Sequence, residues 1–150
     1  MLLNLVKKHL SGILLLILLS TSLYAQEHPW RANTEWAKMP GDRTWGSTSA
    51  VFPGKDGTMW VGERCGQNSC VGSDDDPILQ FDRDGNVINS FGAGMIDWPH
   101  GIFVDKENNI WITDAACPGC SNAPRNQGKL GHQIIKFSSC LLYTSPSPRD

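Results

Sequence analysis

Residues 98–114 carry the sequence WPHGIFVDKENNIWITD, and the organisation of the chain follows from this stretch. Two runs in it, residues 102–104 and 110–114, are rich in β-branched and aromatic side chains, as β-strands are. Asn108 and Asn109 separate the runs, and asparagine tolerates the left-handed backbone that a tight turn requires. The stretch therefore predicts a β-hairpin. His100 follows a proline just before the first strand, so we expect its imidazole to project from one end of the sheet.

The same pattern recurs along the chain. Asp-Gly pairs at residues 56–57 and 84–85 each separate two short apolar runs, which is a hairpin signal. The further strands are expected at residues 47–52, 59–63, 78–82, 86–91 and 133–137. Because the chain has 15 glycines and no long helical periodicity after residue 25, these runs predict an all-β protein.

These strands form an internal repeat. Trp60 aligns with Trp111 and Glu63 with Asp114, both at an offset of 51 residues. Four short strands in a repeat of roughly 40 to 50 residues are typical of a β-propeller blade. The sequence thus predicts a fragment of about two propeller blades.

Blade 1 is expected at about residues 45–92, and three strands of blade 2 at about residues 98–139. A blade buries its faces only against neighbouring blades, so we expect residues 26–139 to expose apolar surface when expressed alone. In this topology the long loops that follow residues 63 and 114 share one rim with the connection that leads into His100.

Both ends of the chain are set apart from this domain. Residues 1–25 read as a secretory signal peptide, because two lysines precede an apolar run shorter than the roughly 20 residues of a membrane span and Ala25 ends the segment. An uncleaved anchor is the alternative. Residues 26–44 are expected to form an N-terminal extension. Residues 140–150 resemble a translated sequencing adapter, so we expect the natural sequence to be interrupted at about residue 139.

The charge and the cysteine content of the chain limit which partners and which kinds of cysteine site are expected. A formal net charge of −2 at pH 7 argues against a nucleic-acid partner. Cys65, Cys70, Cys117 and Cys120 form an even set in a chain expected to be exported, which favours disulfides within each loop or between the two blades. A four-thiolate zinc site is the less favoured alternative, because an oxidising compartment disfavours it.

The segments around residues 51–64 and 99–114 resemble the first blades of peptidyl-α-hydroxyglycine α-amidating lyase and of related NHL-repeat, six-bladed propellers. The resemblance covers roughly residues 45–139. It implies a catalytic zinc held by three histidines, a structural calcium held by backbone carbonyls in the channel, and an arginine and a tyrosine that act on the substrate.

Carried over residue by residue, the resemblance implies that His100 is the first zinc ligand and Arg64 the active-site arginine. Val51 and Ile102 would offer carbonyl oxygens to calcium. The other two histidines, the tyrosine and the remaining calcium ligand would lie in later blades. His132 matches none of these positions and is expected to be an exposed loop or strand-edge residue.

Some residues in these segments could have a structural role instead of a role in binding or catalysis. Arg64 could be a rim arginine paired with Glu63 or Asp74. The run of aspartates at residues 74–76 lacks the spacing of a calcium loop, so we interpret it as solvated loop. Trp60 and Trp111, at equivalent places in the repeat, are expected to pack between blades.

The leading hypothesis is a secreted or periplasmic carbon–nitrogen lyase that converts a peptidyl-α-hydroxyglycine to a peptide amide and glyoxylate. Two alternatives stay open. One is a propeller without enzymatic activity that binds a protein or glycan through its loop rim, and the other is a calcium-dependent, lactonase-type hydrolase. The expected partner is a small peptide or another small molecule, with no nucleic acid and no stable membrane span.

Overall fold

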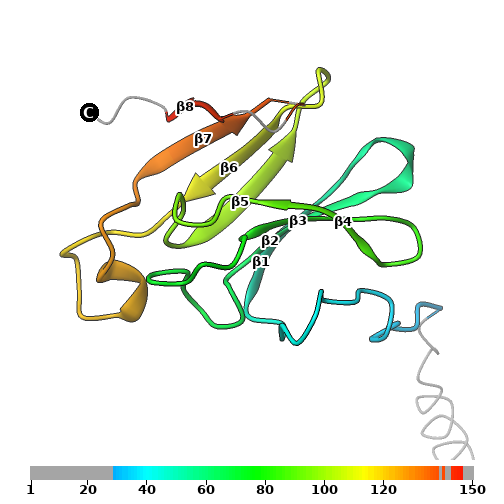
Figure 1. Cartoon of the computed structure of the whole chain (residues 1–150), viewed down its shortest axis with the longest axis horizontal. Helices are drawn as coiled ribbons and strands as arrows, with labels where there is room; N and C mark the ends of the chain where they lie inside the picture. Colours follow the sequence, from blue (N-terminus) through cyan, green and yellow to red (C-terminus); the bar gives the residue numbers. More distant parts are fainter. Residues whose placement is uncertain (1–28, 139, 141–142, 147–150) are drawn as a thin grey trace, which may run out of the picture. The chain divides into compact units, whose positions relative to one another are not determined.

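The computed structural model describes residues 29–138, residue 140 and residues 143–146 (Figure 1). Contacts divide the chain into two units, Met1–Asn33 and Thr34–Asp150. The described part of the first unit, residues 29–33, has no regular secondary structure and is exposed. The expected signal peptide lies outside the described residues. No helix within the described part of the chain is long and apolar enough to cross a membrane.

The second unit is all-β, as predicted, and contains two four-stranded antiparallel sheets in which the strands follow their order in the sequence (Figure 1). No α-helix occurs among the described residues, so the architecture is that of about two propeller blades. The first sheet comprises β1 (Thr48–Pro53), β2 (Met59–Glu63), β3 (Ile78–Phe81) and β4 (Val87–Phe91). The second comprises β5 (Pro99–Val104), β6 (Ile110–Asp114), β7 (Gln133–Phe137) and β8 (Tyr143–Pro146), and the short 3-10 helices are η2 (Lys55–Gly57) and η3 (Pro124–Asn126).

Residues 98–139 contribute the three strands β5 to β7, and strand β8 adds a fourth from the segment after residue 139. Its backbone pairs with β7 in antiparallel register, with Lys136 opposite Ser145. These residues belong to the segment that resembles a translated adapter. This segment pairs with β7 because an edge strand presents a row of unpaired N–H and C=O groups, which pair with almost any extended segment within reach.

In each of two turns, at the end of the sheets opposite the long loops, one aspartate side chain accepts hydrogen bonds from the turn backbone. Asp105 accepts backbone N–H groups of Glu107 and Asn109 at 3.1 and 2.8 Å and the Asn109 side-chain amide at 2.9 Å. Asp82 holds residues 84–86 in the same way. Asn108 has φ +65°, the left-handed conformation predicted for the hairpin turn.

The main hydrophobic core lies between the two sheets. Trp60, 2% exposed, and Ile78 from the first sheet pack against Ile110, Ile112 and other residues of the second sheet. Trp60 therefore packs between the blades, as predicted. The core also includes Ile96, Val104, Ile135 and Phe137, with Phe52, Phe91, Met95 and Ile102 at its margin.

A segment N-terminal to β1 covers the opposite face of the first sheet. Trp36 and Met39 pack on the second core cluster, Val61, Leu79 and Phe81. The close approach depends on Gly85, which has φ +78° and whose α-carbon faces the Trp36 carbonyl so closely that a β-carbon would overlap it. The first sheet is thus covered on both faces.

The corresponding outer face of the second sheet is open. Phe103 and Ile134 are 53% and 45% exposed, and together with Gly101, Ile102, Trp111 and Thr113 they line an apolar depression of about 430 Å³. No described sheet covers this face, so the expectation that Trp111 packs between blades stays a prediction. Its indole N–H donates to Asp105 at 2.9 Å, and the Lys136 ammonium lies 5.0 Å from the ring centre.

Candidate functional site

Three loop segments meet at one rim of the two sheets. Cys70, in the loop between β2 and β3, donates its backbone N–H to the Asp97 carbonyl at 2.8 Å. Leu130, in the loop between β6 and β7, donates to the Asp97 carboxylate at 2.8 Å. The segment before β5 therefore lies between the two long loops, as the propeller topology predicts. At the opposite end, the Lys55 ammonium donates to the Lys106 carbonyl at 3.1 Å, which joins two short turns.

A buried carboxylate at the end of β2 organises the first long loop. Glu63 has no exposed surface, and it accepts backbone N–H groups of Gly46, Cys65 and Gly66 at 2.6, 3.0 and 2.8 Å. Its remaining partner is the Arg43 guanidinium. The two amides that follow Arg64 are held by this carboxylate, and the Arg64 N–H itself donates to the Ser47 carbonyl at 3.1 Å, so the start of the loop has a defined path.

Asp114, the repeat partner of Glu63, does the same at the end of β6. Its carboxylate accepts the backbone N–H groups of Asp97, Trp98 and Ala116 at 2.9, 2.9 and 3.2 Å. The Gln133 amide adds a fourth bond at 3.2 Å. Two of these bonds fix the residues that immediately precede the Pro99-His100 pair. The alignment of an acidic residue at the end of both strands was the sequence signal for this role.

His100 is the extra residue of a β-bulge at the start of β5. Pro99 pairs with Asp114 and Gly101 with Thr113, so His100 has no residue opposite it. The first sheet has a bulge at the equivalent place, where Ser49 stands between Thr48 and Ala50. Bulges redirect a side chain at the edge of a sheet, and here the imidazole is exposed at the rim, as expected.

Arg64 reaches across to the same place from the other blade. Its Nε–H donates to the Pro99 carbonyl at 3.2 Å, and its Nη1 donates to the Asn68 side-chain oxygen at 2.5 Å. The plainer reading, an ion pair with Glu63 or Asp74, is wrong for the described residues, since Glu63 binds Arg43 instead. Arg64 and His100, 36 residues apart in sequence, therefore share one rim.

Two residues that no sequence pattern indicated, Trp98 and Arg125, lie between and beside these groups. The Trp98 ring centre is 4.1 Å from the Arg64 guanidinium carbon and 5.3 Å from the His100 ring centre. Arg125, in η3, lies over the same indole at 4.7 Å. Burial, and after it repulsion from Arg125, lowers the pKa of Arg64 below its ordinary value. Neither residue carried a motif that could have revealed this contact.

The expected calcium ligands occupy equivalent places in the first strand of each sheet. Val51 lies in β1 opposite Val61, and Ile102 lies in β5 opposite Ile112. Strands β1 and β5 contact one another across the two sheets. Their carbonyl oxygens are the kind of hard ligand that calcium prefers.

The loop cysteines pair within each loop, which decides between the two arrangements that the sequence left open. Cys65 bonds to Cys70, with a Cα–Cα distance of 5.2 Å, and Cys117 bonds to Cys120, with 5.5 Å. Two disulfides are typical of an extracytoplasmic, oxidising compartment. The alternative of a four-thiolate zinc site is not what these cysteines form.

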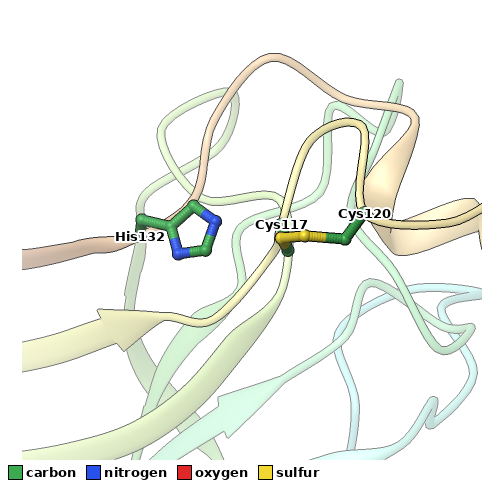
Figure 2. A group of neighbouring side chains, drawn as sticks. All are labelled: Cys117, Cys120 and His132. Carbon is green, nitrogen blue, oxygen red and sulfur yellow. A yellow bond between two sulfur atoms is a disulfide. The ribbon is translucent and has the colours of Figure 1, made fainter.

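His132 lies beside the second disulfide. The ligand atoms of Cys117, Cys120 and His132 are within 4.8 Å of one another, a spacing that could hold a metal ion (Figure 2). His132 is exposed and leads into β7, as expected for a strand-edge residue. While the two sulfurs are bonded to each other they are poor metal ligands, because metals bind the thiolate.

The aspartate run at residues 74–76 forms loop contacts. Asp76 accepts the Ser90 hydroxyl at 2.7 Å and the Ala93 N–H at 3.1 Å. Asp75 lies 3.9 Å from the Arg43 guanidinium, and Asp74 is exposed. The run thus ties its loop to neighbouring segments.

Two comparisons with known proteins bear on the family. No family model matches the chain. A 37-residue stretch is 40% identical to the probable peptidyl-alpha-hydroxyglycine alpha-amidating lyase pgal-1 of Caenorhabditis elegans, and it covers 25% of this chain and 11% of that protein. The chain is therefore distantly similar to an amidating lyase over a short stretch of its length.

Proposed function

We propose that this protein is an exported propeller of the amidating-lyase type, which cleaves a peptidyl-α-hydroxyglycine to a peptide amide and glyoxylate. The observation that carries the proposal is the meeting of Arg64, Trp98 and His100 on one rim, drawn from two blades. The short stretch of similarity to an amidating lyase supports the same chemistry.

In this reaction the bond between the amide nitrogen and the hydroxylated carbon breaks. The electron pair of that bond stays on nitrogen, which gains a proton, while the carbinol hydroxyl loses its proton and becomes the aldehyde of glyoxylate. The substrate keeps its carboxylate throughout. A guanidinium such as that of Arg64 suits this group, because its planar donors match a carboxylate.

The proposal includes zinc at His100 and calcium at the carbonyls of Val51 and Ile102. An exposed neutral imidazole is a good zinc ligand, and zinc acts as a Lewis acid toward hydroxyl and carbonyl oxygens when bound. A catalytic zinc usually takes three protein ligands. Among the described residues, His100 belongs to no group of three or more histidine, cysteine or carboxylate ligands. His100 therefore fits as one ligand of a set and does not form a zinc site by itself.

The test uses protein expressed from its complete gene, with glyoxylate release and metal content measured together. We expect His100→Ala to lower zinc content and abolish activity. Arg64→Ala should leave zinc in place and reduce turnover by about 100-fold, the usual effect of removing one positioned charge donor. Lys106→Ala, on the opposite rim and with its side chain 90% exposed, is the control.

Two outcomes would contradict the lyase. One is a wild-type protein that holds no zinc, and the other is a His100→Ala variant that keeps both metal and activity. Binding of a protein or glycan without glyoxylate release would favour the binding propeller. Release of hydroxy acid from a lactone, dependent on calcium, would favour the hydrolase.

A further inference from the structure

The indole of Trp98 brings together two arginines from different blades. The Arg64 guanidinium carbon is 4.1 Å and that of Arg125 is 4.7 Å from the ring centre. Arg64 begins the loop after β2, whereas Arg125 belongs to η3 in the loop after β6. Stacking on an aromatic face attracts a single cation, but two cations on one ring also repel each other.

This pair of cations has no anionic partner in the described part of the chain. The ion pairs found there involve other cations, and Arg64 donates only to the uncharged Pro99 carbonyl and Asn68 amide. Repulsion from Arg125 contributes to the lowered pKa of Arg64. Binding of an anion between the two guanidiniums would remove this repulsion.

Trp98 itself provides a further unsatisfied donor. Its indole Nε1 is buried and has no hydrogen-bond partner among the described residues. A buried N–H without a partner costs free energy, but Trp98 does not line the adjoining pocket, so this N–H is not assigned to a ligand. The two guanidiniums are both cationic donors, so the missing component is an anionic acceptor.

A small pocket adjoins this cluster. It measures about 200 Å³ and is lined by Gln67, Asn68, Ser69, Pro124 and Arg125, from both long loops. Asn68, one of the lining residues, accepts the hydrogen bond from Arg64, so that guanidinium lies next to the pocket. Drug-sized ligands occupy pockets of about 300–1,000 Å³, so this one suits a smaller group.

We propose that Arg125 joins Arg64 in a two-guanidinium site, stacked on Trp98, that binds a small organic carboxylate at the rim. The anion-binding role follows from the donors alone. It rests on the proposed function only for the identity of the ligand, which would be the carboxylate end of the hydroxyglycine substrate or the glyoxylate product.

Binding without chemistry separates this proposal from the lyase. Protein from the complete gene is titrated calorimetrically with N-acetylglycine, which carries the carboxylate and acylated amine but lacks the hydroxyl that the lyase needs. Its uncharged carboxamide and inorganic phosphate are titrated in parallel. We expect N-acetylglycine to bind, the carboxamide to bind at least tenfold more weakly, and phosphate to compete poorly.

Variants then assign the contact to Arg125. Arg125→Gln should weaken N-acetylglycine binding at least tenfold, and Arg125→Lys, which keeps the charge, should recover part of the loss. Lys106→Gln removes the same charge from the opposite rim and should leave binding unchanged. Thermal melting shows whether each variant is folded. If Arg125→Gln does not fold, the binding of Arg125→Lys is compared with that of the wild type instead, and it should be weaker.

Three results would overturn the proposal: undiminished binding by Arg125→Gln, equal binding of the carboxamide, or tighter binding of phosphate than of N-acetylglycine. Carboxylate binding that depends on Arg125, in a protein that releases no glyoxylate, would uphold the site and reject the lyase. If Arg125→Gln left both glyoxylate release and N-acetylglycine binding unchanged, the lyase would be upheld and the two-guanidinium site rejected.

Discussion

Single carboxylates hold the functional rim in place. Glu63 and Asp114 end the second strand of each sheet. Each accepts three backbone N–H groups, two of which belong to the segment that carries Arg64 or His100. Hydrogen bonds to an ionised, buried acceptor are stronger than those between neutral groups. These carboxylates are therefore positioning residues, one for each blade.

Asp114→Asn should destabilise the protein by roughly 2 to 4 kcal/mol, because the new amide NH₂ faces N–H donors that lose their acceptor. The measurement is urea-induced unfolding, with Asp74→Asn as the control at an exposed position. The amide resonances of Asp97 and Trp98 should shift in the folded variant. Equal stability of the two variants would contradict this role for Asp114.

The lowered pKa of Asp105, in a turn at the opposite end of the sheets, predicts that the stability of the protein depends on pH. The hydrogen bond from the Trp111 indole is the main cause that lowers the pKa of Asp105 to about 2, and bonds from Asn109 contribute further. In the unfolded chain the pKa is about 3.9. The unfolded state thus binds more protons between these values, so this carboxylate's stabilisation is complete above about pH 4 and is lost as the pH falls through about 2.

The indole N–H resonance of Trp111 reports this titration directly. Its chemical shift should change with a midpoint near pH 2, and Asp105→Asn should abolish the change. A midpoint close to pH 4 would mean that the turn does not stabilise the charged form.

At the scale of elements, paired loops and bulges bring the rim residues together. The bulge at His100 and the equivalent bulge at Ser49 show that both blades begin with the same irregular strand. In the first blade the Ser49 hydroxyl donates to the Gly62 carbonyl at 3.1 Å, whereas in the second blade the imidazole is exposed. One backbone device thus serves packing in one repeat and exposure in the other.

The first long loop is closed by the Cys65–Cys70 disulfide, whose two residues are 4% and 6% exposed. Replacing both with alanine should lower the free energy of unfolding by about 2 kcal/mol, the chain-entropy estimate for so short a loop. Urea unfolding measures the loss. The Cys117–Cys120 disulfide closes a shorter loop, so replacing both of these cysteines with alanine should lower the free energy of unfolding by less. Alkylation of all four thiols in unreduced protein, seen by mass spectrometry, would contradict both disulfides.

At the scale of the whole molecule, the two blades differ in what covers them. The N-terminal segment with Trp36 and Met39 covers the outer face of the first sheet. The outer face of the second sheet exposes Phe103 and Ile134. Because a contiguous apolar face is a site of association, this face should govern the behaviour of the isolated blades.

Residues 26–139 expressed alone should aggregate or unfold with weak cooperativity. Phe103→Lys with Ile134→Lys should raise the soluble fraction several-fold, whereas Ile88→Lys, at an exposed position outside that depression, should not. Light scattering and thermal melting measure the two properties. A soluble wild-type monomer with one sharp transition would show that the open face needs no partner.

Local sequence determined the strands and turns of this protein. Alternating and β-branched runs, Asp-Gly and Asn-Asn turns and the 51-residue repeat predicted seven of the eight strands in the described part of the chain, six of them to within one residue. Strand β5 begins three residues before the predicted run, and β8 was not predicted. These features act over a few residues of chain, so they can be recognised without the fold. The shared rim of Arg64 and His100 also followed from the repeat, because antiparallel strands alternate the ends at which their loops emerge.

Tertiary structure decided everything that depends on which groups meet. The disulfide pairing, the convergence of Arg125 on Trp98 and the open environment of Trp111 join or separate residues that no local pattern relates. Strand β8 pairs with the free edge of β7, a contact that no sequence pattern predicted. Contacts of this kind depend on the packing of distant segments, and the physical reason is that side-chain proximity is set by the folded backbone and not by spacing along the chain.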